Sequence, residues 1–150
     1  GSMHSVLFNR CCQMDCFSNK GALHVPFKTV GSISQEINLV HTHMQAWEMN
    51  LCTGVRTSQF NQISAMIDNL PTTNCLIVGD FNQNPDTELF SEDITPIQTT
   101  APTFKHYFYD HAYTNMDQTT IQVGHIHDDY GPSDHKAVVI ALFNSTMTNP

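Results

Sequence analysis

Three apolar segments of this chain each adjoin a cluster of polar, chemically reactive side chains where the apolar run stops. The segments are residues 39–45 (LVHTHMQ), 76–85 (LIVGDFNQNP) and, with the polar part first, 131–142 (GPSDHKAVVIAL). Rigid strands position side chains at a sheet edge more accurately than loops do, and α/β sheets bind ligands beyond their strand ends. The pattern therefore predicts a β-sheet whose edge gathers His, Asp and Asn side chains into one site.

The periodicity of the remaining sequence predicts an α/β fold, with a mixed β-sheet and flanking helices. Apolar positions recur at intervals of three and four in residues 55–70, which indicates an amphipathic helix that Pro71 closes. Residues 86–90 are expected to form a helical turn, and residues 44–54 and 91–103 are expected to be loops. The expected strands comprise residues 22–30, 37–40, 75–79, 104–113, 120–126 and 137–143.

Length and charge limit the classes of protein to which the chain can belong. Its 150 residues suffice for one domain, which we place at residues 3–150, because Gly1 and Ser2 look like a cloning remnant before Met3. The net charge is −8, and the Lys and Arg residues form no basic stripe. Since duplex DNA binders need cations to neutralise phosphates, large nucleic acids are disfavoured partners. No apolar run reaches the roughly 18 residues of a membrane span, so we expect no transmembrane segment.

Five residues of the three segments are candidates for catalysis: His43, Asp80, Asn82, Asp134 and His135. Each has an ordinary structural explanation when it is taken alone. A Thr-His pair at a strand end is usually a satisfied polar group, Gly-Asp is usually a turn, and Ser-Asp-His often merely precedes a strand. Their joint occurrence in this order favours a shared site.

The strings THMQ, GDFNQNP and SDH resemble three C-terminal signatures of the endonuclease/exonuclease/phosphatase family, which is also called DNase I-like. Other stretches resemble further family patterns: Arg56 with Gln59 and Gln62, Pro102-Thr103-Phe104, and Asp110-His111. Within the family the chain is most similar to neutral sphingomyelinases, through residues 12–21 (CQMDCFSNKG) and 41–47 (HTHMQAW). The resemblance implies the C-terminal half of a four-layer DNase I-like sandwich, in a secreted or extracellular protein.

The resemblance also implies a role for each candidate in metal-dependent phosphodiester hydrolysis. Asp80, Asn82 and His135 would form the metal side of the site, with Mg²⁺ as the expected ion, and His135 is alternatively the general base. Asp134 would fix the orientation of the His135 ring. His43 would donate a hydrogen bond to a phosphoryl oxygen in the transition state.

Further predictions concern the surroundings of the site. The resemblance implies that Asp15 and Lys20 pair on a loop beside the site, where the structural alternative is a solvated turn. Gln45 is assigned to the substrate or to this loop. A disulfide between Cys12 and Cys52 is also implied, and reduced, buried thiols are the alternative.

Two motifs of the family's N-terminal half are missing from the sequence: an Asn on the first strand and a Glu that is the main metal ligand. Glu36 lies in the wrong place to be that Glu. A half sandwich would expose an apolar sheet face, so we expect a homo-oligomer or a partner chain to cover it. Two functions follow from the resemblance. The first is sphingomyelinase-like hydrolysis of a phospholipid or small phosphodiester, impaired by the missing motifs, and the second is an inactive homologue (a pseudoenzyme) that binds or has a structural role.

Overall fold

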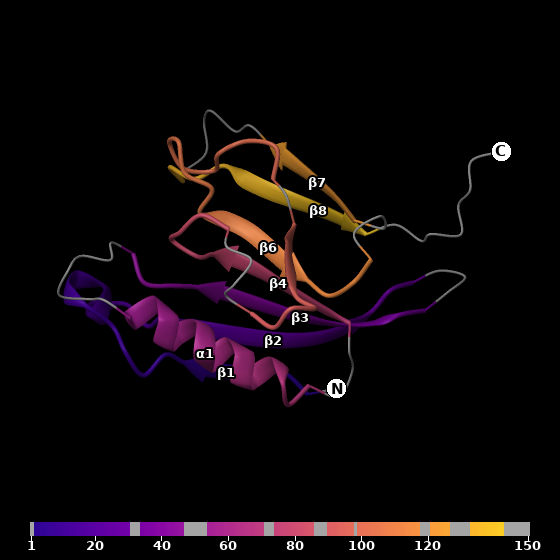
Figure 1. Ribbon diagram of the computed structural model, residues 1–150, viewed down its shortest axis with the longest axis horizontal. Helices are drawn as coiled ribbons and strands as arrows, with labels where there is room; N and C mark the ends of the chain where they lie inside the picture. The colour runs from indigo at the N-terminus through magenta and orange to yellow at the C-terminus, as the bar shows by residue number, and fades with distance from the viewer. Residues whose placement is uncertain are drawn as a thin grey trace.

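A six-stranded mixed β-sheet forms the centre of the protein, and a two-stranded sheet lies beside it (Figure 1). The computed structural model describes residues 2–30, 34–46, 54–70, 74–85, 90–97, 99–117, 121–126 and 133–142. The large sheet has the strand order β1-β2-β3-β4-β6-β5, and β7 pairs with β8 in the small sheet. The bounds are β1 His4–Leu7, β2 Gly21–Lys28, β3 Glu36–His43, β4 Cys75–Asp80, β5 Thr95–Ile97, β6 Asp110–Thr114, β7 Ile121–Ile126 and β8 Ala137–Leu142.

The helix α1 (Val55–Ile67) connects β3 to β4, which are parallel neighbours in the large sheet. A parallel pair needs such a crossover, whereas the other described strand pairs are antiparallel. The helix begins after Gly54, whose φ of 79° lies in the left-handed region that glycine adopts without steric cost. The predicted mixed sheet with a flanking helix is therefore confirmed, although the helix ends at Ile67 and not at residue 70.

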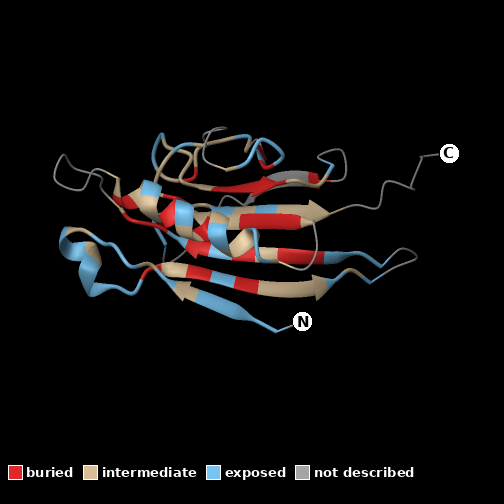
Figure 2. Cartoon of the chain, turned by 60° about the horizontal axis from the view of Figure 1, so that its bottom comes forward, coloured by how far each residue is buried: buried red, intermediate tan, exposed pale blue. Residues whose placement is uncertain are grey.

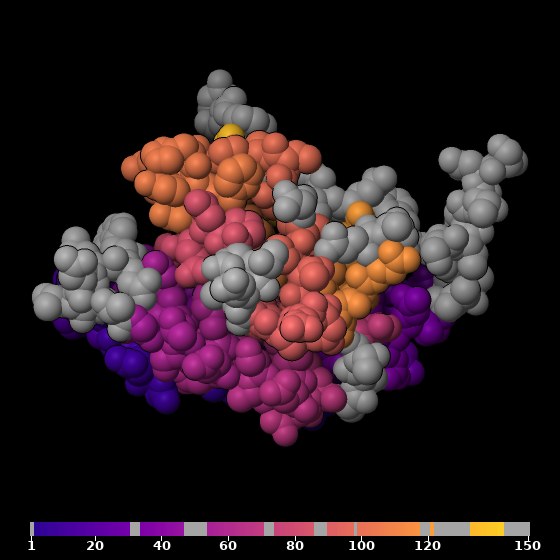
Figure 3. Space-filling model, viewed as in Figure 1, coloured from indigo at the N-terminus to yellow at the C-terminus, as the bar shows by residue number. Residues whose placement is uncertain are grey.

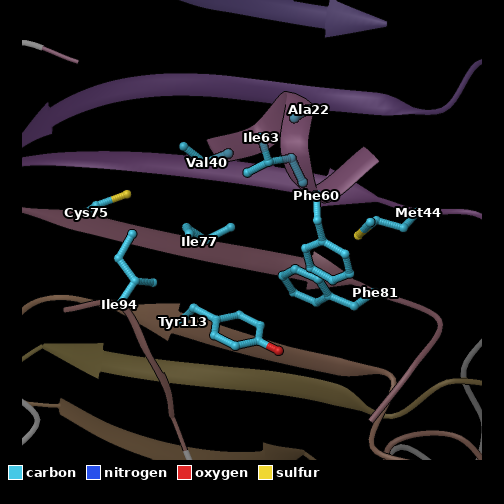
Figure 4. Close-up of a cluster of buried hydrophobic side chains, with 10 residues drawn as sticks. All are labelled: Ala22, Val40, Met44, Phe60, Ile63, Cys75, Ile77, Phe81, Ile94 and Tyr113. Atoms are coloured by element: carbon cyan, nitrogen blue, oxygen red, sulfur yellow. The ribbon is translucent and has the colours of Figure 1, made fainter. Parts of the chain in front are cut away.

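One face of the large sheet is covered by α1 and forms the main core (Figure 4). Strand alternation sends Val40 of β3 and Ile77 of β4 to this face, where they cluster with Phe60 of the helix. The Phe81 ring stacks on Phe60 at 5.9 Å between centroids and meets Tyr113 edge-on at 5.3 Å. Figure 3 shows the helix and the segments after β4 on this side of the molecule. Each such buried side chain contributes roughly 1.5–3 kcal/mol of stability, so this face holds the fold together.

The opposite face of the large sheet is only partly covered by the small sheet, which lies away from α1 in Figure 1. A second core forms there from Ile37, Leu76, Ile97, Ala112 and Ile121. Beside it runs an open apolar groove of about 500 Å³, lined by Phe27, Leu39, Leu76, Val78, Val138, Ile140 and Leu142. The expected exposed apolar face is present in this groove, and its covering by a second copy or a partner chain stays a prediction.

The prediction of one strand over residues 104–113 was wrong, because only the segment from Asp110 onwards joins the sheet. Phe104 and Tyr107 instead pair across a tight turn, with Lys105 at a φ of 52°. Tyr107 and Tyr109 stack on one another at 4.9 Å. The aromatic side chains that favoured the strand prediction here stack on one another within a turn.

The two predictions for residues 86–103 had different outcomes. The expected loop at 91–103 contains the short strand β5, and its Pro96 is tolerated because β5 is an edge strand. The expected helical turn at 86–90 lies mostly outside the described residues. Near the N-terminus the short 3-10 helix η1 (Gln13–Phe17) is closed by a disulfide between Cys11 and Cys16.

The predicted Cys12–Cys52 disulfide falls on Cys52, which lies outside the described residues, so the pairing stays a prediction. Cys12 is itself disulfide-bonded. Cys75 is a buried free thiol, and burial raises its pKa to about 12. No helix among the described residues is long and apolar enough to cross a membrane.

Candidate active site

One row of residues crosses five neighbouring strands at an end of the large sheet. The register pairs Leu7 with Gly21, Gly21 with His43, His43 with Asp80, and Asp80 with Asp110. Directly paired residues project to the same face of a sheet, so three reactive side chains meet on the face that the small sheet half covers. The row accounts for the proximity of residues that are far apart in the sequence.

Gly79 lets β3 and β4 approach closely beside this row. Its φ is 148°, and a Cβ atom on it would lie 1.9 Å from the backbone oxygen of Thr42. Only glycine fits this position without displacing a strand. The residue therefore sets the spacing of His43 and Asp80, which follow Thr42 and Gly79 on their strands.

His135 joins the row from the segment that leads into β8. The Lys136 N–H donates to the Thr103 carbonyl at 2.8 Å, which fixes this segment beside the large sheet. The His135 Nδ1 atom lies 2.6 Å from Asp110 Oδ2 and 4.0 Å from Asp80 Oδ2. An imidazole that donates its Nδ1–H to Asp110 keeps a lone pair on Nε2, where it can accept a proton.

His43 contacts both a cation and a carboxylate. The Lys20 Nζ donates to His43 Nε2 at 2.7 Å, and Asp80 Oδ2 lies 3.5 Å from the same nitrogen. Burial lowers the pKa of His43, the Lys20 charge lowers it further, and the Asp80 charge opposes the change. His43 is therefore neutral at pH 7. Because an ammonium can only donate, the hydrogen of the neutral ring resides on Nδ1.

Asp80 is placed where a negative charge is disfavoured. Burial raises its pKa most strongly, and the nearby Asp110 charge adds to the increase. The backbone N–H of Asn82 donates to Asp80 Oδ1 at 2.8 Å and opposes this increase. A bound cation would relieve the cost of holding two carboxylates together at this point.

The ligand atoms of Asp80, Asp110 and His135 all lie within 4.8 Å of one another. Asn82 adds an amide whose Nδ2 donates to the Met44 carbonyl at 3.0 Å, which leaves its side-chain oxygen as an acceptor. Mg²⁺ is usually held by one or two carboxylates together with water and substrate oxygens. The donor set therefore fits a small divalent cation.

The loop beside the site contains the expected Asp15–Lys20 pair, at 3.5 Å. Lys20 also donates to the Met44 carbonyl at 3.0 Å, so its ammonium links the loop both to His43 and to the residue that follows it. Gln45 is buried, and it exchanges hydrogen bonds with the Cys12 backbone: it accepts from N at 2.9 Å and donates to O at 3.1 Å. These bonds assign Gln45 to the loop.

A hollow of about 430 Å³ collects the predicted catalytic residues. All five, His43, Asp80, Asn82, Asp134 and His135, line it, together with Asp110 and the rings of Phe104 and Tyr109. One predicted role needs correction, because Asp110 and not Asp134 bonds to the Nδ1 atom of His135. Asp134 is exposed at the rim of the hollow.

Asp110 is the residue of the candidate site that the sequence prediction missed. It opens β6, and its position was hidden inside the strand wrongly expected at 104–113. The resemblance of Asp110-His111 to a family pattern was the available signal. His111 itself is buried in the core, where burial lowers its pKa to about 4, so it is not part of the titrating site.

The sequence matches no protein-family model and no curated protein, but solved structures share its fold. Sphingomyelinase C from Streptomyces griseocarneus is 21% identical with a TM-score of 0.66, over 95% of this chain and 64% of that one. A beta toxin mutant from Staphylococcus aureus, with bound magnesium ions, is 19% identical with a TM-score of 0.67, over 92% and 62%. D. rerio TDP2, complexed with single strand DNA product, is 17% identical with a TM-score of 0.64, over 96% and 67%.

These likenesses confirm the predicted DNase I-like, endonuclease/exonuclease/phosphatase fold. The chain spans less than two thirds of the length of the sphingomyelinase and beta toxin structures. At these identities the likeness concerns the fold, and function has to be argued from the site.

Proposed function

We propose that this chain carries out metal-dependent hydrolysis of a phosphodiester of the sphingomyelin type. The observation that carries the proposal is the convergence of His43, Asp80, Asp110 and His135 on one hollow at the end of the sheet. The shared fold with a sphingomyelinase supports the choice of substrate class. The fold is also shared with a TDP2 that is complexed with a single strand DNA product, so the fold alone does not select the substrate class.

His135 is the proposed general base. Hydrolysis requires a water molecule in line with the leaving oxygen, and a group that removes its proton. The 2.6 Å contact of Nδ1 with Asp110 leaves Nε2 as the proton acceptor. The same contact favours this role over that of a metal ligand, because the Nδ1 atom that lies 4.0 Å from Asp80 is already bonded to Asp110.

His43 is the proposed hydrogen-bond donor to the phosphate. With Lys20 bonded to Nε2, its Nδ1–H is the group that can donate to a phosphoryl oxygen as charge develops there. Lys20 adds a positive charge behind the ring without contacting water freely, because its side chain is buried. Removal of one such donor costs roughly 10²–10³ in rate.

Asp80 and Asp110, with the side-chain oxygen of Asn82, would hold the divalent cation, for which Mg²⁺ is the proposed ion. When bound, Mg²⁺ supplies charge neutralisation on the phosphoryl oxygens and lowers the pKa of water. Asp134 at the rim would then contact the entering water or headgroup. In these assignments His135 removes a proton from the attacking water, and His43 keeps its proton and donates it in a hydrogen bond to the phosphate.

A second candidate is a binding protein without turnover. One observation favours it: Asp110 is already engaged by His135 at 2.6 Å, so this carboxylate serves two partners if a cation also binds. In this case the site would bind phosphate esters and release them unchanged. The predicted oligomer and the predicted extracellular location remain compatible with both candidates.

The test is hydrolysis of sphingomyelin in mixed micelles and of bis-p-nitrophenyl phosphate by the pure protein, with Mg²⁺ and with EDTA. We expect Mg²⁺-dependent release of product, and a loss of roughly 10²–10⁴ in rate for His135→Asn, as general base catalysis implies. His106→Asn is the matched control, because His106 is exposed on the neighbouring turn. Retained phosphate ester binding without any Mg²⁺-dependent turnover would instead establish the second candidate.

A further inference from the structure

We propose that Met14 and Phe17, on the disulfide-closed loop around η1, dock the active-site end of the protein onto a zwitterionic phospholipid bilayer. This inference rests on the proposed function, since it concerns how a lipid phosphodiester reaches the hollow. We call these two side chains the docking tip. They are 70% and 86% exposed, and both lie on the same short loop.

The exposure of the docking tip is built into the fold. The Cys11–Cys16 disulfide closes the turn that carries Met14, and Phe17 follows directly. Asp15, between the two, accepts the Ala46 N–H at 2.5 Å. The loop is thus fastened beside the end of β3, and Figure 2 shows most of it coloured as exposed. A loop fastened in this way presents apolar groups to an external apolar partner.

The docking tip lies at the same end of the molecule as the catalytic hollow. In Figure 1 the indigo loop of η1 lies at the end towards which the arrows of β3 and β4 point. Asp15 contacts Lys20 at 3.5 Å, and Lys20 contacts His43 at 2.7 Å, so two side-chain contacts separate the loop from the site. A surface that receives the tip therefore faces the entrance of the hollow.

The charge near the tip matches a zwitterionic surface. Lys20 and Asp15 are largely buried and pair with one another, so Arg10 is the exposed charge of residues 10–20, within a chain of net charge −8. The rest of the chain would be repelled by a strongly anionic membrane. Exposed Arg10, beside the tip, suits the phosphate of a phospholipid headgroup. Amphipathic surfaces of this kind bind in the interface region without spanning the bilayer.

The experiment measures co-sedimentation of the protein with phosphatidylcholine vesicles in EDTA, where hydrolysis is off. We expect Met14→Ser combined with Phe17→Ser to weaken vesicle binding about ten- to a hundredfold, because apolar area no longer leaves water. Val30→Ser is the matched control: Val30 is fully exposed but follows β2 at the opposite end of the sheet, and its loss should leave binding unchanged. Phosphatidylglycerol vesicles should bind the wild type more weakly than phosphatidylcholine vesicles.

A second measurement keeps the outcome independent of folding and of catalysis. Phe17→Trp should show a blue shift of its emission on addition of vesicles, over the background of Trp47 in the wild type, whereas Val30→Trp should not. Hydrolysis of bis-p-nitrophenyl phosphate, which needs no membrane, should be unchanged in the serine variants. If that reaction fails in the wild type while vesicle binding persists, the proposed function fails and docking stands. Equal vesicle binding by the docking-tip variants and the Val30 control would overturn docking. Dissociation of a protein dimer by the serine substitutions would also overturn it, because the partner of the tip would then be a second copy of the chain.

Discussion

The two faces of the large sheet use the same strands for different purposes. On the face under α1, Val40 and Ile77 are fully buried. On the other face their sequence neighbours Leu39 and Val78 line an open groove. Asp80, two residues after Val78, is the next residue of β4 on this face. One face is closed and holds the fold together, whereas the other is left open where chemistry requires access. The comparison indicates that stability and reactivity alternate along single strands of this protein.

Truncation of a ring on the closed face should have the largest effect and tests the comparison directly. Phe60→Ala removes a fully buried ring that stacks on Phe81, and we expect a loss of roughly 3–5 kcal/mol in the free energy of unfolding. Ile140→Ala, on the half-buried strand β8, should cost much less, because its groove is already open to water. Urea denaturation followed by circular dichroism measures both. Equal losses would mean that the two faces are equally important for stability.

A change at the boundary between the faces should have the next largest effect. Gly79→Ala places a Cβ atom against the Thr42 carbonyl, so β3 and β4 must separate, at a cost of roughly 1–3 kcal/mol. Gly54→Ala is the control, because Gly54 also has a positive φ but has open space around its Cβ position. Thermal denaturation of both variants gives the difference. If Gly54→Ala is the more damaging of the two, backbone conformation and not strand spacing governs this boundary.

On the open face, replacement of the Asp80 carboxylate by an amide should increase the free energy of unfolding and abolish cation binding. Burial and Asp110 raise the pKa of Asp80 above its unfolded value, so the folded protein binds this proton more tightly. The free energy of unfolding then decreases as pH rises through that pKa, and Asp80→Asn should be more stable than the wild type at pH 7 in EDTA. Below the ordinary carboxyl pKa of about 3.9 the difference should vanish.

The measurement is urea denaturation at pH 3 and pH 7, with exposed Asp93→Asn as the control. Added Mg²⁺ should stabilise the wild type and leave Asp80→Asn unaffected. A variant that is less stable at pH 7 would show that Asp80 has a structural role, and the contrast between the faces would then be weaker.

The smallest expected effect concerns the linkage between the loop and the site. Lys20→Met removes a positive charge 2.7 Å from His43 and should raise the pKa of His43, while burial, the larger cause of its lowered pKa, persists. Titration of the ring protons of His43 by NMR measures this change. A pKa that stays the same or falls would indicate that the loop does not act on the site electrostatically.

The sequence predicted the parts of the structure that depend on local pattern. The 3.6-residue period placed α1, the apolar runs placed β3, β4 and β8, and polar residues at strand ends placed five side chains around one hollow. The pairing of Asp110 with His135 depends on which residue of β6 lies opposite Asp80, and no local pattern contains that register. The Cys11–Cys16 disulfide was not predicted for a related reason, because cysteine spacing does not determine connectivity.

Successive side chains of a strand point to opposite faces of the sheet, so a residue can reach the site only if it faces the correct side. The residues that share the row with the site are Leu7, Gly21, His43, Asp80 and Asp110. Adding or deleting one residue within β3 or β4 would turn every later side chain of that strand to the other side, whereas a change of two residues would restore the original direction. Evolution can therefore exchange side chains along these strands far more easily than it can alter their length by an odd number. Insertions in a protein built this way should accumulate in its connecting segments.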